Sequence, residues 1–124
     1  MLGRAALVAF VAATDLARAR AFYEGTLGLA VLEDTPFALV LDAAGTTLRV
    51  SAVEHLSPAP FTVLGWTVPD LEAVIGALRA AGVPMVRFTG MAQDDLGAWR
   101  APGGARVAWF ADPDGNTLSI TQEP

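Results

Sequence analysis

Acidic and amide side chains gather near the end of the chain, in the stretch WFADPDGNTLSITQ. Asp112, Asp114 and Asn116 lie within five residues of one another, and oxygen donors this close together could hold a metal ion or move a proton. The same stretch reads Asp-Pro-Asp-Gly, the pattern of a type I turn, in which Pro presets φ and Gly supplies a positive φ. Strand-forming residues flank it on both sides. The sequence therefore predicts a hairpin turn, with a functional role as the alternative.

Arg49 is the most specific single candidate for a ligand-binding residue. It lies within a strand-like stretch. A guanidinium in apolar surroundings needs a partner, since a lone buried charge is costly. It could clamp an anionic or carbonyl-bearing ligand. It could instead form an internal ion pair with Asp94, Asp95 or Glu54, or extend its head to water. The sequence leaves these alternatives open.

The segment Phe88–Arg100, FTGMAQDDLGAWR, is a second candidate region. Loops of this composition often form the rim or lid of a cavity, and Met91 and Trp99 could clasp an apolar ring. An ordinary hairpin loop is the alternative. The two adjacent acids could act as a general base by residue type, but we expect them to be solvated. The only histidine, His55, is expected in an exposed linker.

The composition narrows the range of functions. The chain has 124 residues, of which 53% are hydrophobic, and its net charge is −5. All eight basic residues are Arg, and no basic stripe exists to neutralise phosphates, so nucleic acid is not an expected partner. The chain has no Cys, which excludes thiolate chemistry. The apolar run at residues 5–13 is too short to span a bilayer, and we expect a cytoplasmic protein without membrane contact.

A repeat organises the chain. Residues 7–29 and 62–83 each begin with an apolar, β-branched stretch and continue with apolar residues at helical spacing. An Asp precedes each helical segment as a potential N-cap, and a Gly follows it as a potential left-handed C-cap. These residues are Asp15 and Gly28 in the first half, and Asp70 and Gly82 in the second.

Short strands follow each helix. We expect them at Ala30–Glu33, Phe37–Leu41 and Thr46–Ala52 in the first half, and at Met85–Phe88, Ala98–Ala101, Arg106–Ala111 and Thr117–Thr121 in the second. The sequence thus predicts a single domain, residues 1–124. It contains unit one (1–53), a Pro-rich linker (54–60) and unit two (61–124).

The paired units, with the motifs DLARARAFYEGTLGL and FADPDGNTLSI, resemble the vicinal oxygen chelate superfamily. This group includes glyoxalase I, extradiol dioxygenases, fosfomycin-resistance enzymes and bleomycin-binding proteins. The resemblance covers essentially the whole chain. It implies an α+β fold in which two paired βαβββ units form a curled mixed β-sheet around a cavity, with the helices on the convex face. It indicates function only weakly, because members of this fold do different chemistry.

The resemblance also implies where a metal would be held. Metal-dependent members take His or Glu ligands from the first and last strands of each unit, and the corresponding positions here are Val8, Arg49, Val63 and Ser119. Val cannot ligate, Arg repels a cation, and Ser is at best a weak neutral ligand. We therefore expect no metal site and no cofactor.

Strand alternation predicts what fills the cavity instead. If those four positions face it, so do apolar, aromatic and hydroxyl side chains of the same strands, which is typical of a small-molecule site. One bulge would exchange the inward and outward residues of a strand. No catalytic residue is assigned. The candidate ligand-binding residues are Val8, Phe10, Arg49, Ser51, Val63, Met91, Trp99, Trp109 and Ser119.

These features predict a metal-free small-molecule-binding protein of the glyoxalase/bleomycin-resistance type. Its ligand would be apolar or aromatic and could carry an anionic group. Two alternatives remain: a glyoxalase-like lyase, isomerase or dioxygenase with unusual metal ligands, and an interaction module without a small ligand. A homodimer is expected, because small members of this group commonly pair and open sheet edges need cover.

Overall fold

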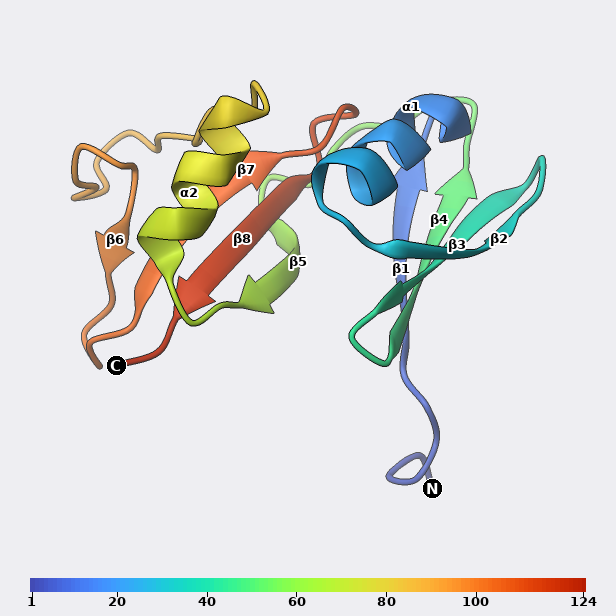
Figure 1. Cartoon of the computed structure of the whole chain (residues 1–124), viewed down its shortest axis with the longest axis horizontal. Coiled ribbons are helices and arrows are strands. Elements are labelled where there is room, and N and C mark those ends of the chain that lie inside the picture. Colours follow the sequence, from blue (N-terminus) through green and yellow to red (C-terminus); the bar gives the residue numbers. More distant parts are fainter. The chain divides into compact units, whose positions relative to one another are not determined.

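The computed structural model describes all 124 residues and divides them into two compact units, Met1–Ser57 and Pro58–Pro124 (Figure 1). The boundary falls inside the linker expected at residues 54–60, where His55 is exposed as predicted. Each unit contains helix and one four-stranded mixed sheet in the order βαβββ. The predicted α+β repeat is therefore confirmed.

Unit one begins with β1 (Val8–Ala13) and α1 (Leu16–Arg20), which continues as a π-helical segment, η1 (Ala21–Thr26). Three strands follow, β2 (Ala30–Asp34), β3 (Ala38–Ala43) and β4 (Thr46–Ala52). The strand order is β1-β4-β3-β2, with β1 parallel to β4 and the other pairs antiparallel. The first and last strands of the unit are therefore neighbours.

Unit two repeats this arrangement. It contains β5 (Thr62–Thr67), α2 (Leu71–Ala80), β6 (Trp99–Arg100), β7 (Arg106–Ala111) and β8 (Thr117–Gln122). The strand order is β5-β8-β7-β6, and β5 runs parallel to β8. Neither unit contains a helix long and apolar enough to cross a membrane.

The helix ends follow the sequence signals. Asp15 and Asp70 each accept a hydrogen bond from the backbone N–H three residues further on, at 3.0 and 3.1 Å. Gly28 and Gly82 close the helices with φ of 79° and 84°, a conformation that costs other residues a steric clash. Both predicted caps are confirmed in both units.

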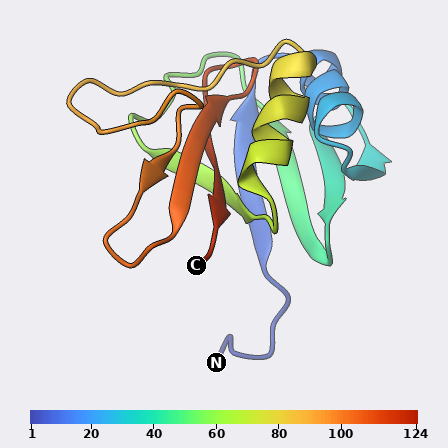
Figure 2. The same cartoon turned by 60° about the vertical axis from the view of Figure 1, so that its left-hand side comes forward.

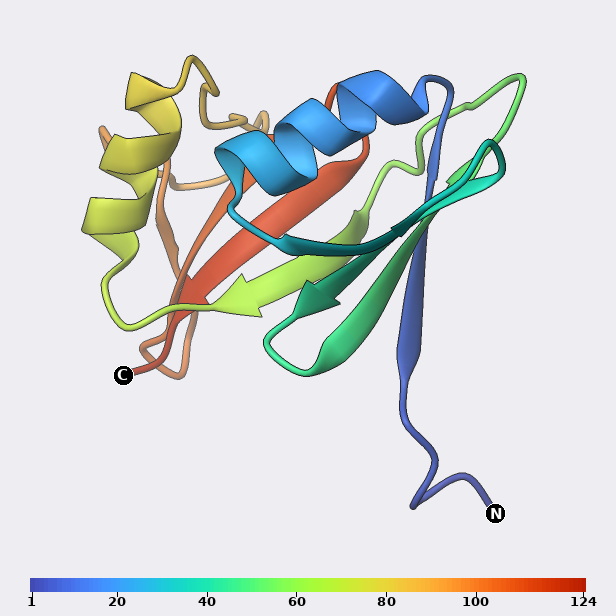
Figure 3. The ribbon, with the colours of Figure 1, turned by 45° about the vertical axis from the view of Figure 1, so that its right-hand side comes forward.

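Alternation along the strands separates a core face from an open face in each sheet. Leu48 and Val50 in β4, and Leu118 and Ile120 in β8, are buried. In unit one α1 packs over β3 and β4 (Figure 3), and in unit two α2 packs over β7 and β8 (Figure 2). The helices bury the expected faces, which include Ala19, Phe22, Tyr23, Leu71, Ile75 and Leu78.

The strand predicted at Met85–Phe88 is wrong. These residues form an irregular segment, although Val86 N–H donates to the carbonyl oxygen of Trp109 in β7 at 2.7 Å. The Phe88 N–H and the Val86 carbonyl oxygen pair with a side chain instead of a neighbouring strand, as described below. Smaller differences are confined to strand ends: Phe37, for example, lies outside β3 and is exposed.

Candidate functional site

The open face of the unit-two sheet lies opposite α2. Because Phe110 and Leu118 point into the core, their neighbours Trp109 and Thr117 project from the other face. Trp66 has core-face parity and stacks on Phe110, with ring centroids 6.4 Å apart. The two tryptophans therefore lie on opposite faces of the sheet.

A pocket of about 220 Å³ opens on this face around Trp109. It combines three aromatic side chains, one thioether, one proline and two threonine hydroxyls, and it has no ionisable side chain. This composition favours an apolar, uncharged ligand group and offers no acid or base for proton transfer. The lining residues are Pro60, Phe61, Thr62, Phe88, Met91, Trp109 and Thr117.

The indole of Trp109 is the centre of an aromatic cluster. Phe88 meets it edge to face, with centroids 5.3 Å apart and an interplanar angle of 90°. Trp99, from β6, lies 6.3 Å away on the same face, because it pairs with Val107 in the ladder. The Trp109 Nε1–H donates to Thr62 Oγ1 at 3.0 Å, which fixes the orientation of the ring. The aromatic side of the pocket therefore has a fixed shape before any ligand binds.

A bulge decides which residue of β5 reaches the pocket. Thr62 pairs with Thr117 and Leu64 pairs with Leu118, so Val63 is an extra residue between them. This irregularity places Thr62 on the open face. Val63, the residue expected there from strict alternation, is partly exposed and does not line the pocket.

Ser119 lies beside the pocket, on the same face, and is buried. It pairs with Gly65 on one side and Trp109 on the other. A Cβ on Gly65 would lie 2.6 Å from the Oγ of Ser119, so the glycine provides the room that this hydroxyl occupies. Ser119 is therefore packed closely against Gly65, and a role for it in ligand binding stays a prediction.

The other four predicted residues lie together on the open face of the unit-one sheet. Phe10 pairs with Arg49 across β1 and β4, and Ser51 and Val8 lie on the same face two residues away along their strands. Phe10 is 62% exposed and Val8 is also exposed. The hypothesis that all nine predicted residues line one cavity stays a prediction, since each unit presents its own face.

Arg49 forms no hydrogen bond or ion pair through its guanidinium, although it is only partly exposed. The ion pair considered with Asp94 is not formed, because the Asp94 carboxylate lies 3.5 Å from Arg106 instead. Asp95 contributes only its carbonyl oxygen, to Arg79. The ligand-clamping and solvent-reaching alternatives remain.

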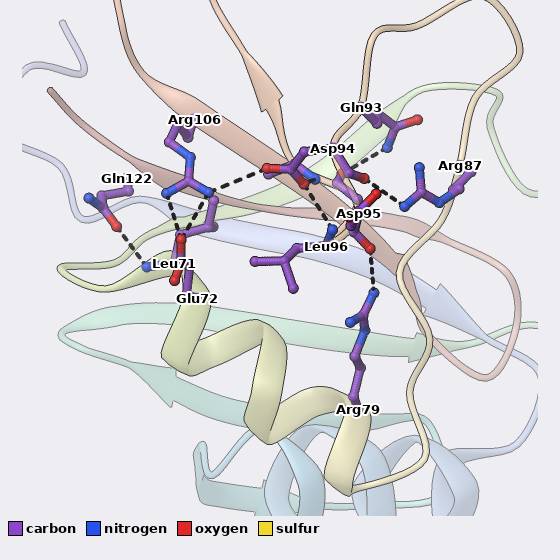
Figure 4. A network of polar contacts seen from close by, with 12 residues as sticks. Leu71, Glu72, Arg79, Arg87, Gln93, Asp94, Asp95, Leu96, Arg106 and Gln122 are labelled. Atoms are coloured by element: carbon purple, nitrogen blue, oxygen red, sulfur yellow. Dashed lines mark hydrogen bonds and ion pairs between the residues drawn. The ribbon is translucent and has the colours of Figure 1, made fainter.

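The two acids in the Phe88–Arg100 segment have structural contacts (Figure 4). Asp94 Oδ1 accepts backbone N–H groups of Leu96 and Ala98 at 3.0 and 2.9 Å. The bond from Ala98, that from Leu96 and the nearby Arg106 together lower the pKa of Asp94, against a smaller opposing effect of burial. A carboxylate stabilised in its charged form is a poor general base at neutral pH.

The opening acid cluster is a turn. Asp112 Oδ1 accepts from the N–H groups of Asp114 and Asn116, and Oδ2 accepts from Asn116 Nδ2 at 2.8 Å. Gly115, with φ of 87°, donates its N–H to the Asp112 carbonyl oxygen. The predicted hairpin turn is confirmed, and its carboxylate is already used by backbone donors.

The donor set does not fit a metal ion. The positions that correspond to the ligands of metal-dependent relatives lie on β1, β4, β5 and β8 and carry Val8, Arg49, Val63 and Ser119. No group of three or more His, Cys, Asp or Glu side chains is arranged to hold a cation anywhere in the chain. We therefore derive no chemistry through a metal.

Comparison with known proteins places the chain in a family. A family model described as the Glyoxalase/Bleomycin resistance protein/Dioxygenase superfamily matches residues 4–120. The chain belongs to this superfamily, and the resemblance predicted from its motifs is confirmed. None of the curated proteins compared with the chain matches it.

Solved structures show the same fold. A glyoxalase family protein from Bacillus anthracis matches with a TM-score of 0.76 at 16% identity, covering 98% of this chain and 96% of that one. A lactoylglutathione lyase from Agrobacterium tumefaciens matches with a TM-score of 0.74 at 17% identity, covering 96% and 93%. An antibiotic-binding protein from a Streptomyces species matches with a TM-score of 0.76 at 24% identity, covering 100% and 99%. At these identities the likeness shows the fold alone.

Of the predicted site residues, Met91 and Trp109 line this pocket and Trp99 lies next to Trp109, while most of the lining was not predicted. Pro60 and Phe61 were assigned to the linker and its edge, and Phe88 to a strand. The missed signal was the set of aromatic residues at 61, 88 and 109, each within or next to a strand-like stretch. Thr62 could not be found without knowledge of the bulge.

Proposed function

We propose that this chain is a metal-free small-molecule-binding protein, and that its ligand presents a planar aromatic group to Trp109. One observation carries the proposal: a preformed pocket of about 220 Å³ in which an indole meets Phe88 and Met91, with no ionisable side chain in the lining. The likeness to an antibiotic-binding protein supports binding as the activity.

The aromatic side chains of the pocket are preorganised for binding. A stacked aromatic pair contributes about 0.5–1.5 kcal/mol beyond the burial of its area. The Met91 sulfur is polarizable and adapts its shape to a ring edge. Because Thr62 already holds the indole in place, a ligand does not have to immobilise it on binding. The arrangement therefore favours flat, neutral rings over flexible or charged groups.

The test is titration with a neutral aromatic fluorophore, N-phenyl-1-naphthylamine. We expect saturable binding that Trp109→Leu weakens by about tenfold or more, since one stacking surface is lost. Trp66→Phe is the matched control, because that indole lies on the core face and should leave affinity unchanged. Absence of saturable binding to the folded wild type, or equal loss in both variants, would contradict the proposal.

Arg49, on the open face of unit one, supports a separate binding role. Its partly exposed guanidinium has no partner in the chain, and Arg49 pairs with Phe10 across β1 and β4. We propose that Arg49 receives an anionic group of a ligand, because a guanidinium matches the geometry of a carboxylate. Arg49→Gln should weaken 1-naphthoate by about tenfold and leave 1-naphthol unchanged. Equal effects on the two probes, or the same change in Arg4→Gln, would contradict this role.

Assembly and location follow as further proposals. The outer edges of β1 and β5 have no neighbouring strand within their own sheets, and such edges are commonly covered by association. We therefore propose a homodimer, which sedimentation at micromolar concentration tests by mass. A monomer would contradict it. Action in the cytoplasm stays a prediction from the sequence.

A further inference from the structure

Residues 85–91, which follow α2 and precede β6 in the sequence, form one wall of the pocket and are held in place in an unusual way. Phe88 and Met91 both face the pocket, yet the segment that carries them is not a strand. Its direct ladder contact with β7 is the bond from Val86 N–H to the Trp109 carbonyl oxygen. The Phe88 N–H and the Val86 carbonyl oxygen have no partner in a neighbouring strand, because no strand pairs with this segment beyond that one bond.

One side chain supplies those partners. The Gln93 Oε1 accepts from Phe88 N–H at 2.8 Å, and its Nε2 donates to the carbonyl oxygens of Val86 at 3.0 Å and Gly97 at 2.8 Å. The carboxamide thus takes the place of a neighbouring strand. It accepts from the Phe88 N–H and donates to the Val86 carbonyl oxygen, as the backbone of a paired strand would. Only an amide side chain offers one acceptor and two donors at this reach.

The third of these bonds connects the wall to a firm anchor. Gly97 belongs to the turn that Asp94 stabilises, and the Asp94 carboxylate lies near Arg106 of β7. Arg87 of the wall donates to the Asp94 carbonyl oxygen at 2.6 Å. The wall is therefore tied to this turn as well as to the sheet (Figure 4). Gln93 itself does not line the pocket.

We infer that Gln93 is the positioning residue of the pocket: its carboxamide holds Phe88 and Met91 against Trp109. Without these three bonds, the segment keeps only the Val86 ladder bond and the Arg87 bond to the Asp94 carbonyl oxygen, and neither of these holds Phe88 itself. The consequence for binding rests on the proposed function. The consequence for the wall does not, and it can be measured in the protein alone.

The matched variants are Gln93→Met and Gln122→Met, which remove the chain's two glutamines by the same near-isosteric change. Gln122 accepts one bond, from Leu71 N–H at the start of α2. We expect Gln93→Met to raise the exchange rate of the Phe88 amide by about tenfold and to weaken N-phenyl-1-naphthylamine to a similar extent. Gln122→Met should change neither quantity.

A wild-type measurement protects the test against misfolding of a variant. Both Nε2 protons of Gln93 are engaged, so its side-chain amide should exchange more slowly than that of Gln122, which acts as an acceptor only. Equal exchange of the two side chains, or an unchanged Phe88 amide in Gln93→Met, would overturn the inference. If the wild type does not bind the probe, the proposed function fails while the exchange data still decide the role of Gln93.

Discussion

The Nε1–H of Trp109 reaches Thr62 Oγ1 across an intervening strand. The two residues belong to β7 and β5, and β8 lies between these strands in the sheet. The indole therefore lies over β8, with Thr117 among the residues beside it in the pocket. A single hydrogen bond thus joins the two sides of the site and orients its largest ring.

Thr62→Val tests this bond, because it keeps the β-branched shape and removes the acceptor. The loss should cost about 0.5–1.5 kcal/mol of unfolding free energy, since water can reach the freed indole N–H. Affinity for N-phenyl-1-naphthylamine should fall several-fold as the ring gains freedom. Chemical denaturation and fluorescence titration measure the two effects. Thr67→Val, at the other end of β5, is the control, and an equal loss of affinity there would refute the assignment.

Gly65 and Ser119 form a second testable pair. Gly65→Ala should destabilise the protein by about 1 kcal/mol, because the new methyl group forces the Ser119 hydroxyl from its place. In a Ser119→Ala background the same change should be neutral, since the Ser119 Cβ lies 4.0 Å from the added atom. A double-mutant cycle of unfolding free energies measures this coupling. Additive effects would show that the hydroxyl is not the obstacle.

The Asp112 turn should be structurally important. Asp112→Ala removes the acceptor of two backbone N–H groups and of the Asn116 amide, and both bonds from Asn116 are buried. We expect a loss of about 3 kcal/mol in unfolding free energy. Asp95→Ala, whose partner Arg79 binds only the backbone carbonyl, should change stability by less than about 0.5 kcal/mol. Thermal or urea denaturation compares the two variants.

Asp94 predicts a specific pH dependence. Its pKa is lowered in the folded protein, mainly by the bond from Ala98 and also by Leu96 and Arg106. The charged form therefore stabilises the fold above the unfolded value of 3.8, and this contribution is lost as pH falls through the lower folded pKa. Asp94→Asn should lower stability at pH 7 only slightly, since the side chain is 48% exposed, and not at all at the acid limit. A difference that grows on acidification would contradict this.

Metal addition separates the binder from the enzyme alternative. With Ni²⁺, Mn²⁺, Zn²⁺ or Fe²⁺ added, the melting temperature of freshly purified protein should change by less than about 1 °C. A metal raises the melting temperature only when the folded state binds it, and the donor set of this chain does not fit a metal ion. Near-stoichiometric metal accompanied by a rise in melting temperature would revive a lyase or dioxygenase. It would also show that the mapping of the ligand positions is wrong.

The elements predicted well were those with strong local signals. Asp15 and Gly28 define one helix, as Asp70 and Gly82 define the other, because caps act over a few residues and leave a clear pattern. Alternation along β4 and β8 likewise separated buried from open faces. The irregular segment at Met85–Phe88 was missed because its composition resembles a strand, while its partner is a side chain five residues beyond it.

The turn at Asp94 has the same pattern as the turn at Asp112, and this pattern is visible in the sequence. In both turns the Asp carboxylate accepts the N–H groups two and four residues on, and a Gly three residues on donates to the Asp carbonyl oxygen. The spacing Asp-x-x-Gly is visible at Asp94 as clearly as at Asp112. Recognising it would have removed Asp94 from the list of candidate bases. The wall held by Gln93 has no comparable local signal.

The extra residue at Val63 reverses the alternation of side chains along β5. Upstream of it, the side chains that face core and pocket are exchanged relative to a regular strand. Were β5 regular, Val63 would take the place of Thr62, and the indole of Trp109 would meet a methyl group instead of a hydroxyl. The polarity of the pocket therefore depends on chain length as well as on side-chain identity, so a lineage could alter what it binds by gaining or losing one residue.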